Sequence, residues 1–397
     1  MAATIAASLE AHQLGAAVRP ALRARLGRLR GGYDIPRWVR DEDGGTVVTP
    51  GKMAAVIADD GSLNWLRCDE GDVFHRRVVV PEPGATWDPA STTLEATPVS
   101  YSDVAIAANA TEVIALYIDA TGLRARSSSD DGATFASEVT VTAGYFPAWF
   151  DLAFNAAGDP VIFASAGDHT LFTMERVAGV WSSPDHWSES AEWSNPPGGT
   201  RGIEGLAVAP AGGDFQVVVA GERADGAFGV FGYVFGDTVL PADDWFGGKQ
   251  IQSADAGGGV TFTHPHLEAV GTGGLWASWR QVHAGDVAHS RIYVTHANTD
   301  LGALGDWMEP APFDFDGDQT AAGLALAVSD DYLYGVSPRG VWLSERSAGM
   351  EDVSTRVKAC KCGVGLDGGR LTLELAGLEL PGELVVGGLV EVSAGYL

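Results

Sequence analysis

Residues 128–135 read SSDDGATF, a Ser-x-Asp-x-Gly-x-Thr-aromatic pattern with strand-like sequence on both sides. Its defining positions are Ser128, Asp130, Gly132, Thr134 and Phe135. The Ser and Asp side chains can accept hydrogen bonds from nearby backbone amides and so close a tight turn. Gly132 can adopt the positive φ angle that such a turn needs, and Phe135 can anchor the hairpin in an apolar layer. The stretch therefore predicts a β-hairpin closed by its own side chains.

A second, looser copy of this pattern lies roughly sixty residues earlier in the chain. Residues 67–74 read RCDEGDVF, with Arg67 where Ser is expected and with matches at Asp69, Gly71 and Phe74. Both copies resemble the Asp box of sialidase-like β-propellers, which caps the hairpin between a blade's two outer strands. The resemblance implies that Phe74 and Phe135 are buried at equivalent sites in different blades. An isolated hairpin turn in another β fold is the alternative interpretation.

The region from residue 45 to residue 350 repeats one pattern six times: an apolar strand, a polar turn, a second strand and a more polar hairpin. Six units of roughly fifty residues suit four-stranded blades around a central channel. We therefore predict an all-β fold with a six-bladed β-propeller. It would have seven blades if the strand-like residues 22–30 or the C-terminal segment contributed one.

Composition supports a β-rich chain and excludes two classes of partner. The 52 Gly and 12 Trp among 397 residues are typical of an all-β protein. The net charge of −27 argues against nucleic acid, because phosphate contacts need clusters of Lys and Arg. No apolar run is long enough to predict a membrane span. The three cysteines are too few for a disulfide framework.

Two terminal segments flank the predicted propeller. Residues 1–44 are rich in Arg although the chain is acidic, so we expect them to dock on an acidic surface. The expected docking residues are Arg19, Arg23, Arg25, Arg28 and Arg30. Within this segment, residues 3–17 predict a short helix, whereas residues 18–29 fit either a helix or a strand. Residues 351–397 alternate cleanly and predict a small β segment.

Candidate catalytic and metal-binding residues do not converge on an enzyme. Residues 33–36 read YDIP and resemble a sialidase motif, but Asp34 stands where the carboxylate-binding Arg belongs. His264 and His266 could begin a metal site, and residues 314–318 could form a calcium loop. Structural histidines and an acidic turn are the simpler interpretations. We therefore predict no catalytic residue, no cofactor and no metal, with a sialidase-like hydrolase as the alternative.

The whole layout resembles tail-associated β-propeller proteins of phages and related tail-like particles. An Arg-rich segment precedes a propeller with sparse Asp boxes, and residues 352–357, 366–368 and 371–373 resemble the start of a tail-hub-type domain. The resemblance implies a non-enzymatic structural or adhesin-like protein on the exterior of a virion tail. Its expected partners are other tail proteins and a host-surface glycan. A secreted lectin is a further alternative.

Overall fold

The structure is a computed structural model that divides the chain into two compact units, which we call the propeller unit and the terminal unit. The propeller unit comprises Val39–Ser329 and Leu333–Leu343, and the terminal unit comprises Met1–Trp38, Asp330–Tyr332 and Ser344–Leu397. The structure describes residues 4–9, 20–26, 39–43, 50–69, 72–79, 91–95, 103–166, 171–186, 202–211, 213–223, 226, 228–236, 246–254, 260–270, 274–283, 291–298, 307, 310–313, 323–329, 332–337, 340–345, 351–352, 357–365, 368–375 and 390–396.

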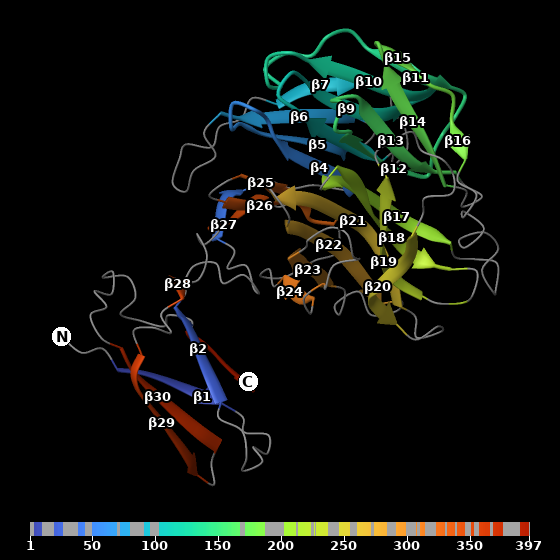
Figure 1. The fold of residues 1–397 in the computed structure, drawn as a ribbon. Coiled ribbons are helices and arrows are strands. Elements are labelled where there is room, and N and C mark those ends of the chain that lie inside the picture. Colours follow the sequence, from blue (N-terminus) through green and yellow to red (C-terminus); the bar gives the residue numbers. More distant parts are fainter. Residues whose placement is uncertain are drawn as a thin grey trace. The chain divides into compact units, whose positions relative to one another are not determined.

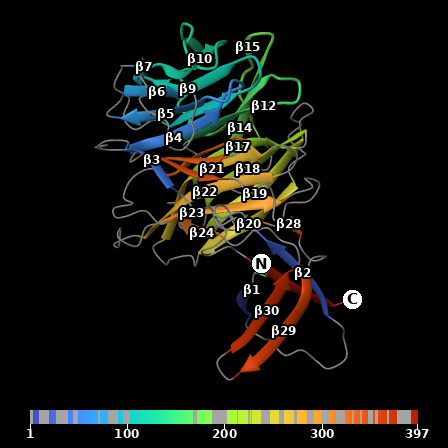
Figure 2. The ribbon, with the colours of Figure 1, turned by 90° about the vertical axis from the view of Figure 1, so that its left-hand side faces the viewer.

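The described residues of the propeller unit form six antiparallel sheets, the blades (Figure 1, Figure 2). Blade one contains β4 (Pro50–Ile57), β5 (Leu63–Asp69), β6 (Asp72–Val78) and β7 (Ser91–Glu95). Blade two contains β8 (Val104–Ala108), β9 (Val113–Asp119), β10 (Gly122–Ser128) and β11 (Val139–Ala143). Blade three contains β12 (Trp149–Phe154), β13 (Pro160–Ser165), β14 (Leu171–Val177), β15 (Val180–Trp181) and β16 (Asp185–His186).

The remaining blades follow the same order. Blade four contains β17 (Ile203–Ala211), β18 (Asp214–Glu222), β19 (Phe228–Gly236) and β20 (Phe246–Ala254). Blade five contains β21 (Val260–Val270), β22 (Gly274–His283), β23 (Arg291–Asn298) and β24 (Ala311–Phe313). Blade six contains β25 (Ala325–Val328), β26 (Tyr332–Ser337), β27 (Gly340–Glu345) and β3 (Val39–Asp43). The first strand of each blade contacts the first strand of the next, and β25 contacts β4, so the ring is closed. The six-bladed prediction is confirmed.

Strand β3 completes the last blade from the other end of the propeller sequence. It pairs antiparallel with β27, with Val39 opposite Leu343 and Asp43 opposite Gly340. The sequence analysis assigned these residues to a separate N-terminal segment ending at residue 44. The structure instead uses them to cover the outer edge of blade six, which would otherwise expose unpaired backbone groups.

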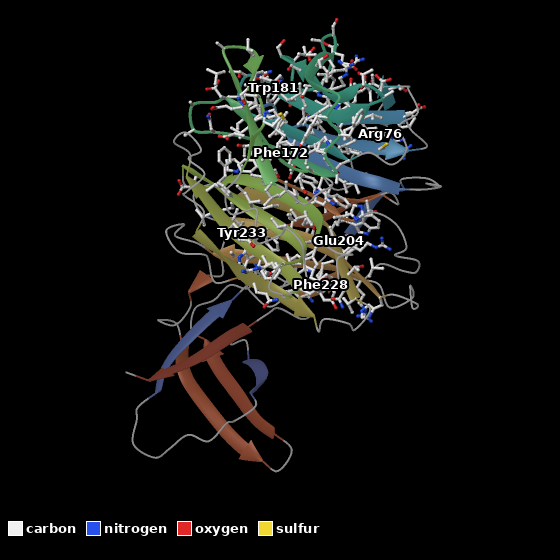
Figure 3. All side chains as sticks on the ribbon, turned by 90° about the vertical axis from the view of Figure 1, so that its right-hand side faces the viewer. Arg76, Phe172, Trp181, Glu204, Phe228 and Tyr233 are labelled. Carbon is white, nitrogen blue, oxygen red and sulfur yellow. The ribbon has the colours of Figure 1, made fainter. Side chains whose placement is uncertain are left out.

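The hydrophobic core lies between neighbouring blades. Strands β9 and β13 are buried along their whole length because both faces of each blade are covered. Large aromatic side chains fill the layers, among them Phe172 between blades two and three, Tyr233 between three and four, and Phe228 between four and five (Figure 3). This double burial explains why these strands read as unbroken apolar runs.

The terminal unit pairs the two ends of the chain. One sheet has the order β1 (Thr4–Leu9), β30 (Gly368–Leu375), β29 (Val357–Gly365), and another has the order β28 (Glu351–Asp352), β2 (Pro20–Leu26), β31 (Val390–Tyr396). The N-terminal and C-terminal segments, which the sequence analysis treated separately, therefore share both sheets. For residues 20–26, the strand interpretation is the right one.

The helix predicted over residues 3–17 is wrong where the structure describes it. Thr4–Leu9 form β1, which pairs in register with β30 from Thr4 opposite Glu374 to Leu9 opposite Gly369. Ile5 and Leu9 satisfy a helical spacing, but residues 5, 7 and 9 also alternate as in a strand. The partner strand lies at the far end of the chain, so the local pattern could not reveal it.

Candidate functional site

The turn at residues 128–135 has the hydrogen bonds that its sequence predicts. The Ser128 Oγ accepts from the Gly132 N–H at 2.8 Å, and the Asp130 Oδ1 accepts from the Thr134 N–H at 2.8 Å. The Thr134 hydroxyl donates to the other Asp130 oxygen at 2.7 Å. Asp131 and Gly132 both have positive φ angles, 54° and 84°. The Ser128 hydroxyl in turn donates to the Asp130 Oδ1 at 2.6 Å. The hydrogen bonds from Ser128 and Thr134 lower the pKa of the Asp130 carboxyl to about 2, and the bond from Ser128 contributes most.

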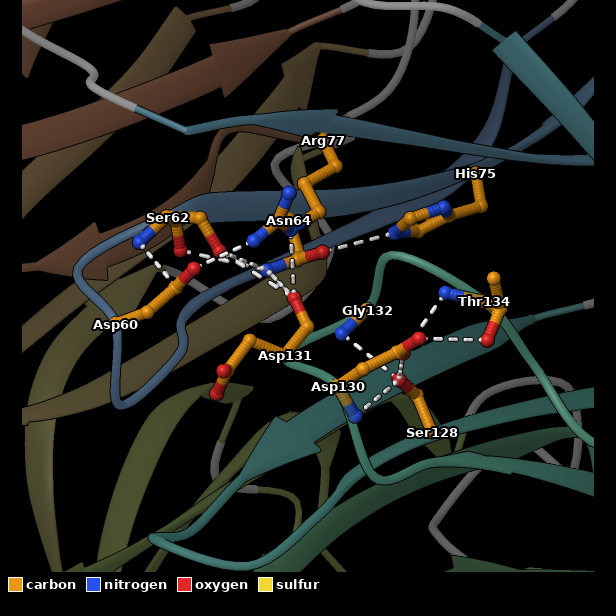
Figure 4. A network of polar contacts seen from close by, with 10 residues as sticks. All are labelled: Asp60, Ser62, Asn64, His75, Arg77, Ser128, Asp130, Asp131, Gly132 and Thr134. Carbon is orange, nitrogen blue, oxygen red and sulfur yellow. Dashed lines mark hydrogen bonds and ion pairs between the residues drawn. The ribbon is translucent and has the colours of Figure 1, made fainter.

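This turn is also docked on blade one (Figure 4). The Asp131 carbonyl accepts hydrogen bonds from the Asn64 side-chain amide at 3.2 Å and from the Arg77 Nε at 2.9 Å. The Ser62 hydroxyl donates to the same carbonyl at 3.3 Å. Gly132 lies against Asn64 so closely that a β-carbon would be 2.1 Å from the Asn64 Oδ1. The left-handed backbone at Asp131 therefore presents one carbonyl to three donors of the neighbouring blade.

His75 extends the contact into the interior of blade one. Its Nε2 lies 3.0 Å from the Asn64 Oδ1, and its ring meets Phe135 edge-on at 4.8 Å between centroids. Burial, together with the nearby charge of Arg77, lowers the pKa of His75 from 6.5 to about 4. Phe135 itself is partly buried against the layer between blades one and two. The network fastens blade two to blade one.

The second predicted copy of the pattern does not occupy the equivalent place. Asp69 ends β5 and pairs with Asp72 at the start of β6, so this stretch joins the second and third strands of blade one. The first copy instead follows β10 and precedes β11, the third and fourth strands of blade two. Phe74 lies within β6, and the equivalence with Phe135 is therefore wrong; Gly71 lies outside the described residues. Residues 67–74 matched the pattern because they hold Asp, Gly and Phe at the same spacing, although they lie at a different place in their blade.

A cavity of about 150 Å³ lies on the propeller axis. Residues from the first strand of every blade line it: Ala54, Ala55, Val56, Ile106, Ala107, Ala108, Asp151, Leu152, Ala153, Phe154, Val208, Ala209, Pro210, His266, Leu267, Glu268, Ala269 and Leu326. The titratable residues in this lining are Asp151, His266 and Glu268, and it includes no Lys or Arg. Most residues of the lining are therefore apolar by type, and each of two blades contributes one acidic side chain.

The two acidic groups differ in their partners. The Asp151 carboxylate accepts hydrogen bonds from its neighbour's N–H at Leu152, 2.9 Å, and from the Val208 N–H of blade four, 3.0 Å. Glu268 is partly exposed, and it lines the cavity. Exclusion of water raises the pKa of Glu268 well above its usual range, and the negative charge of Asp151 raises it further. The site thus holds two carboxyl groups in one lining, and the pKa of one of them, Glu268, is raised.

Asp151 repeats a feature of the preceding blade. Asp103 accepts from the Phe150 N–H of blade three at 2.9 Å, as Asp151 accepts from blade four. Both residues precede by two positions an alanine of the inner strand, Ala105 or Ala153. The sixfold repeat that the sequence analysis found did not single out the Asp in front of these alanines. Glu268, an acidic residue between the apolar residues Leu267 and Ala269, was the other signal in the sequence for this cavity.

One end of the cavity is approached by a β-bulge between Thr263 and His266 of β21. His264 has a positive φ of 50°, and its ring lies edge-on to Trp149 of blade three, with 5.6 Å between centroids. A β-carbon on Gly205 of blade four would lie 2.2 Å from the Pro265 Cδ. The bulge of blade five is therefore packed tightly against two other blades.

Of the other candidate metal and catalytic residues, the structure describes only the histidine pair, His264 and His266. The bulge interrupts the strand between His264 and His266, and the described residues hold no group of three or more metal-ligating side chains. Asp34, residues 314–318 and the docking residues Arg19, Arg28 and Arg30 lie outside the described residues. Arg23 and Arg25 lie in β2. No helix in the described part of the chain is long and apolar enough to span a membrane.

Comparison with known proteins gives the fold and no family. No protein-family model and no curated protein matches the chain. An α-L-arabinanase of Penicillium chrysogenum complexed with arabinobiose is similar, with a TM-score of 0.51 and 13% identity over 78% of this chain and 98% of that one. A protein of unknown function from Dyadobacter fermentans has a TM-score of 0.51 and 11% identity over 79% and 100%. AofleA from Arthrobotrys oligospora has a TM-score of 0.50 and 12% identity over 87% and 95%. At these identities the likeness establishes a β-propeller only.

Proposed function

We propose that this chain is a non-enzymatic attachment protein on the exterior of a phage tail or related tail-like particle, where its propeller contacts glycans of the host surface. One observation carries the proposal: both ends of the chain pair into a small unit of their own, distinct from the closed propeller. Such a unit offers other tail proteins a place to hold the chain, and the propeller then serves contact with the host. The tail-like layout of the sequence supports the same assignment.

The glycan part of the proposal has separate support. The axial cavity is lined by mostly hydrophobic residues together with Asp151, His266 and Glu268, and a small number of polar side chains among hydrophobic ones is usual for a small-ligand site. The similar arabinanase, a propeller of the same fold, was solved with a sugar, arabinobiose. A propeller with a similar fold can therefore bind a sugar.

The assignment to a particle is tested by locating the chain. Particles purified from producing cells are labelled with gold-conjugated antibodies against the propeller and viewed by electron microscopy. The proposal predicts label on tails and recovery of the chain with the particles. Recovery of the chain only as free protein in the medium would favour a secreted lectin and would overturn the tail assignment.

A glycoside hydrolase is the second candidate, and a specific observation favours it. Glycoside hydrolases use a pair of carboxyl groups, and the cavity lining holds such a pair, Asp151 and Glu268, with the pKa of Glu268 raised by burial and by the charge of Asp151. A sialidase is the less suitable variant, because the cavity lining includes no Arg to pair with an acidic sugar. Fluorogenic arabinosides, other neutral glycosides and a sialoside test the candidate. Hydrolysis that Glu268→Gln abolishes would establish the enzyme, whereas no turnover by the folded wild-type chain supports the attachment role.

A further inference from the structure

A charged pair and an aromatic ring meet at the margin of the apolar layer between blades two and three. Arg176 of β14 forms an ion pair with Glu112, which directly precedes β9, and its Nη1 donates to the Ser127 Oγ of β10 at 3.3 Å. The same guanidinium lies over the ring of Trp181 in β15, 5.7 Å from the ring centroid. Trp181 packs against the layer that also holds Phe172, and it is only partly buried (Figure 3). The Arg176 and Glu112 side chains remain 18% and 20% exposed, so the cluster reaches the surface.

Local structure holds these side chains in place. The Asn109 Oδ1 accepts from the Glu112 N–H at 2.9 Å and so fixes the turn that carries Glu112. Trp181 lies opposite Arg176 in the β14–β15 hairpin. The two turn residues of this hairpin, 178 and 179, have positive φ angles of 50° and 83°, as in the tight turns that match the twist of a hairpin. A site that is already ordered loses less conformational freedom when it binds a ligand.

The polar atoms of the cluster are not all used within the protein. In the part of the chain that the structure describes, the Glu112 carboxylate is bonded through Oε1 only, and the Trp181 N–H has no hydrogen-bond partner. A carboxylate oxygen and an indole N–H therefore remain available beside the aromatic ring. The opposite charges of Arg176 and Glu112 cancel, so the cluster offers no excess charge to an ionic ligand.

We propose that Trp181, Arg176 and Glu112 form a surface subsite for a neutral sugar ring that carries adjacent hydroxyl groups. A hydroxyl group both donates and accepts hydrogen bonds, so adjacent hydroxyls match an acceptor and a donor placed side by side. The indole ring supplies an apolar surface for the C–H groups of the sugar. None of the three residues lines the axial cavity, so this contact is separate from it. The inference rests on the proposed glycan contact and specifies where on the propeller the glycan binds.

Saturation-transfer NMR on the full-length chain tests the proposal. The probes are the methyl glycosides of glucose, galactose, mannose, fucose and arabinose, each also in a fully O-methylated form that cannot donate a hydrogen bond. We expect transfer to at least one hydroxylated glycoside and none to its O-methylated form. Trp181→Ala removes the ring, and Glu112→Gln removes the charge of the acceptor while keeping its shape. Either should weaken binding at least about tenfold.

Val180→Thr is the matched control. Val180 adjoins Trp181 in the same hairpin and is 72% exposed. Successive residues of a strand point to opposite faces, so this change leaves the face that carries Trp181 and Arg176 intact. Binding by the control should equal that of the wild-type chain.

The outcomes separate this inference from the proposed function. Each variant is first checked for a wild-type thermal transition, and either cluster variant that passes is sufficient. Undiminished binding by such a variant, an equal loss in the Val180→Thr control, or equal transfer to the O-methylated form overturns the subsite while glycan contact stands. Absence of transfer to every glycoside also overturns it. If the wild-type chain then fails to bind host cells, the glycan part of the proposed function fails as well.

Discussion

At Gly132, the absence of a β-carbon matters both for the conformation of the turn and for the packing of blade two against blade one. Its φ of 84° suits glycine, and its missing side chain leaves room for Asn64, which is fully buried. Asn64 in turn contacts Ser62, His75 and the Asp131 carbonyl. The sequence pattern predicted the glycine for the turn, but the contact with Asn64 lies across 68 residues of chain and had no local signal.

Gly132→Ala should therefore destabilise the fold by more than backbone strain alone would. We expect it to lower the free energy of unfolding by about 2–5 kcal/mol, the sum of a left-handed backbone and a displaced buried amide. Gly61→Ala is the matched control: its φ is 81°, and a β-carbon there would meet nothing within 4 Å. The control should lose about 1–2 kcal/mol. Denaturant unfolding measures both, and equal losses would show that the contact with Asn64 contributes nothing.

His75 should make the propeller sensitive to acid. Its pKa is about 4 in the folded chain and 6.5 ordinarily, so the unfolded chain takes up the proton first as the pH falls. The stability it contributes is fully present above pH 6.5 and is lost as the pH falls to about 4, up to about 3 kcal/mol. His75→Gln keeps a donor for the Asn64 carbonyl and does not titrate. Its melting temperature, compared with wild type from pH 7.5 to 4, should fall less steeply; parallel curves would contradict the assignment.

At the scale of elements, the chain's own pattern predicted the strands whose neighbours are close in sequence. The strand-like sequence on the two sides of the turn, residues 113–118 and 138–141, was expected to form strands, and residues 113–118 and 139–141 lie in β9 and β11. The errors fall where a partner is distant. Strand β1 looked like a helix because its partner β30 is at the other terminus, and the role of β3 in blade six depends on β27. The axial cavity was missed for the same reason, because it exists only when six distant strands converge.

Closure by β3 can be tested with two shortened chains. One spans residues 32–350 and retains β3, and the other spans residues 45–350 and lacks it. Loss of β3 exposes the edge of β27 and removes the strand that ties blade six to the start of the propeller sequence, so we expect the calorimetric transition of the chain that lacks β3 to be at least about 5 °C lower. The longer chain serves as the control for loss of the terminal unit. Coincident transitions would show that β3 is not needed to close the propeller.

At the scale of the whole molecule, the structure divides the Arg-rich cluster of the N-terminus. Arg25 in β2 lies opposite Asp352 on one side and Glu391 on the other, whereas Arg23 lies opposite Ser393. Opposite charges in register stabilise a sheet, and like charges destabilise it. Arg25 therefore lies in register with two acidic residues of its own unit, and we expect Arg23, which lies in register with Ser393, to be the residue of the two that contacts another protein.

Charge reversal should separate these two roles. Arg23→Glu together with Arg28→Glu should reduce the amount of this chain on purified particles, most strongly at low salt, because exposed charges are screened as salt rises. Arg25→Glu alone should instead lower the stability of the terminal unit, since it places three acidic residues side by side. Quantitative mass spectrometry of particles measures the first effect. Normal occupancy at every salt concentration would show that these arginines are not the anchor.

Particle adsorption in the presence of excess soluble chain tests the proposed role most directly. Host cells are preincubated with the purified full-length protein, and the rate at which particles then attach is measured. If the propeller contacts the host surface for the particle, saturating protein should occupy the receptors and slow adsorption in a dose-dependent manner. Adsorption that remains unchanged at saturating wild-type protein would contradict the account.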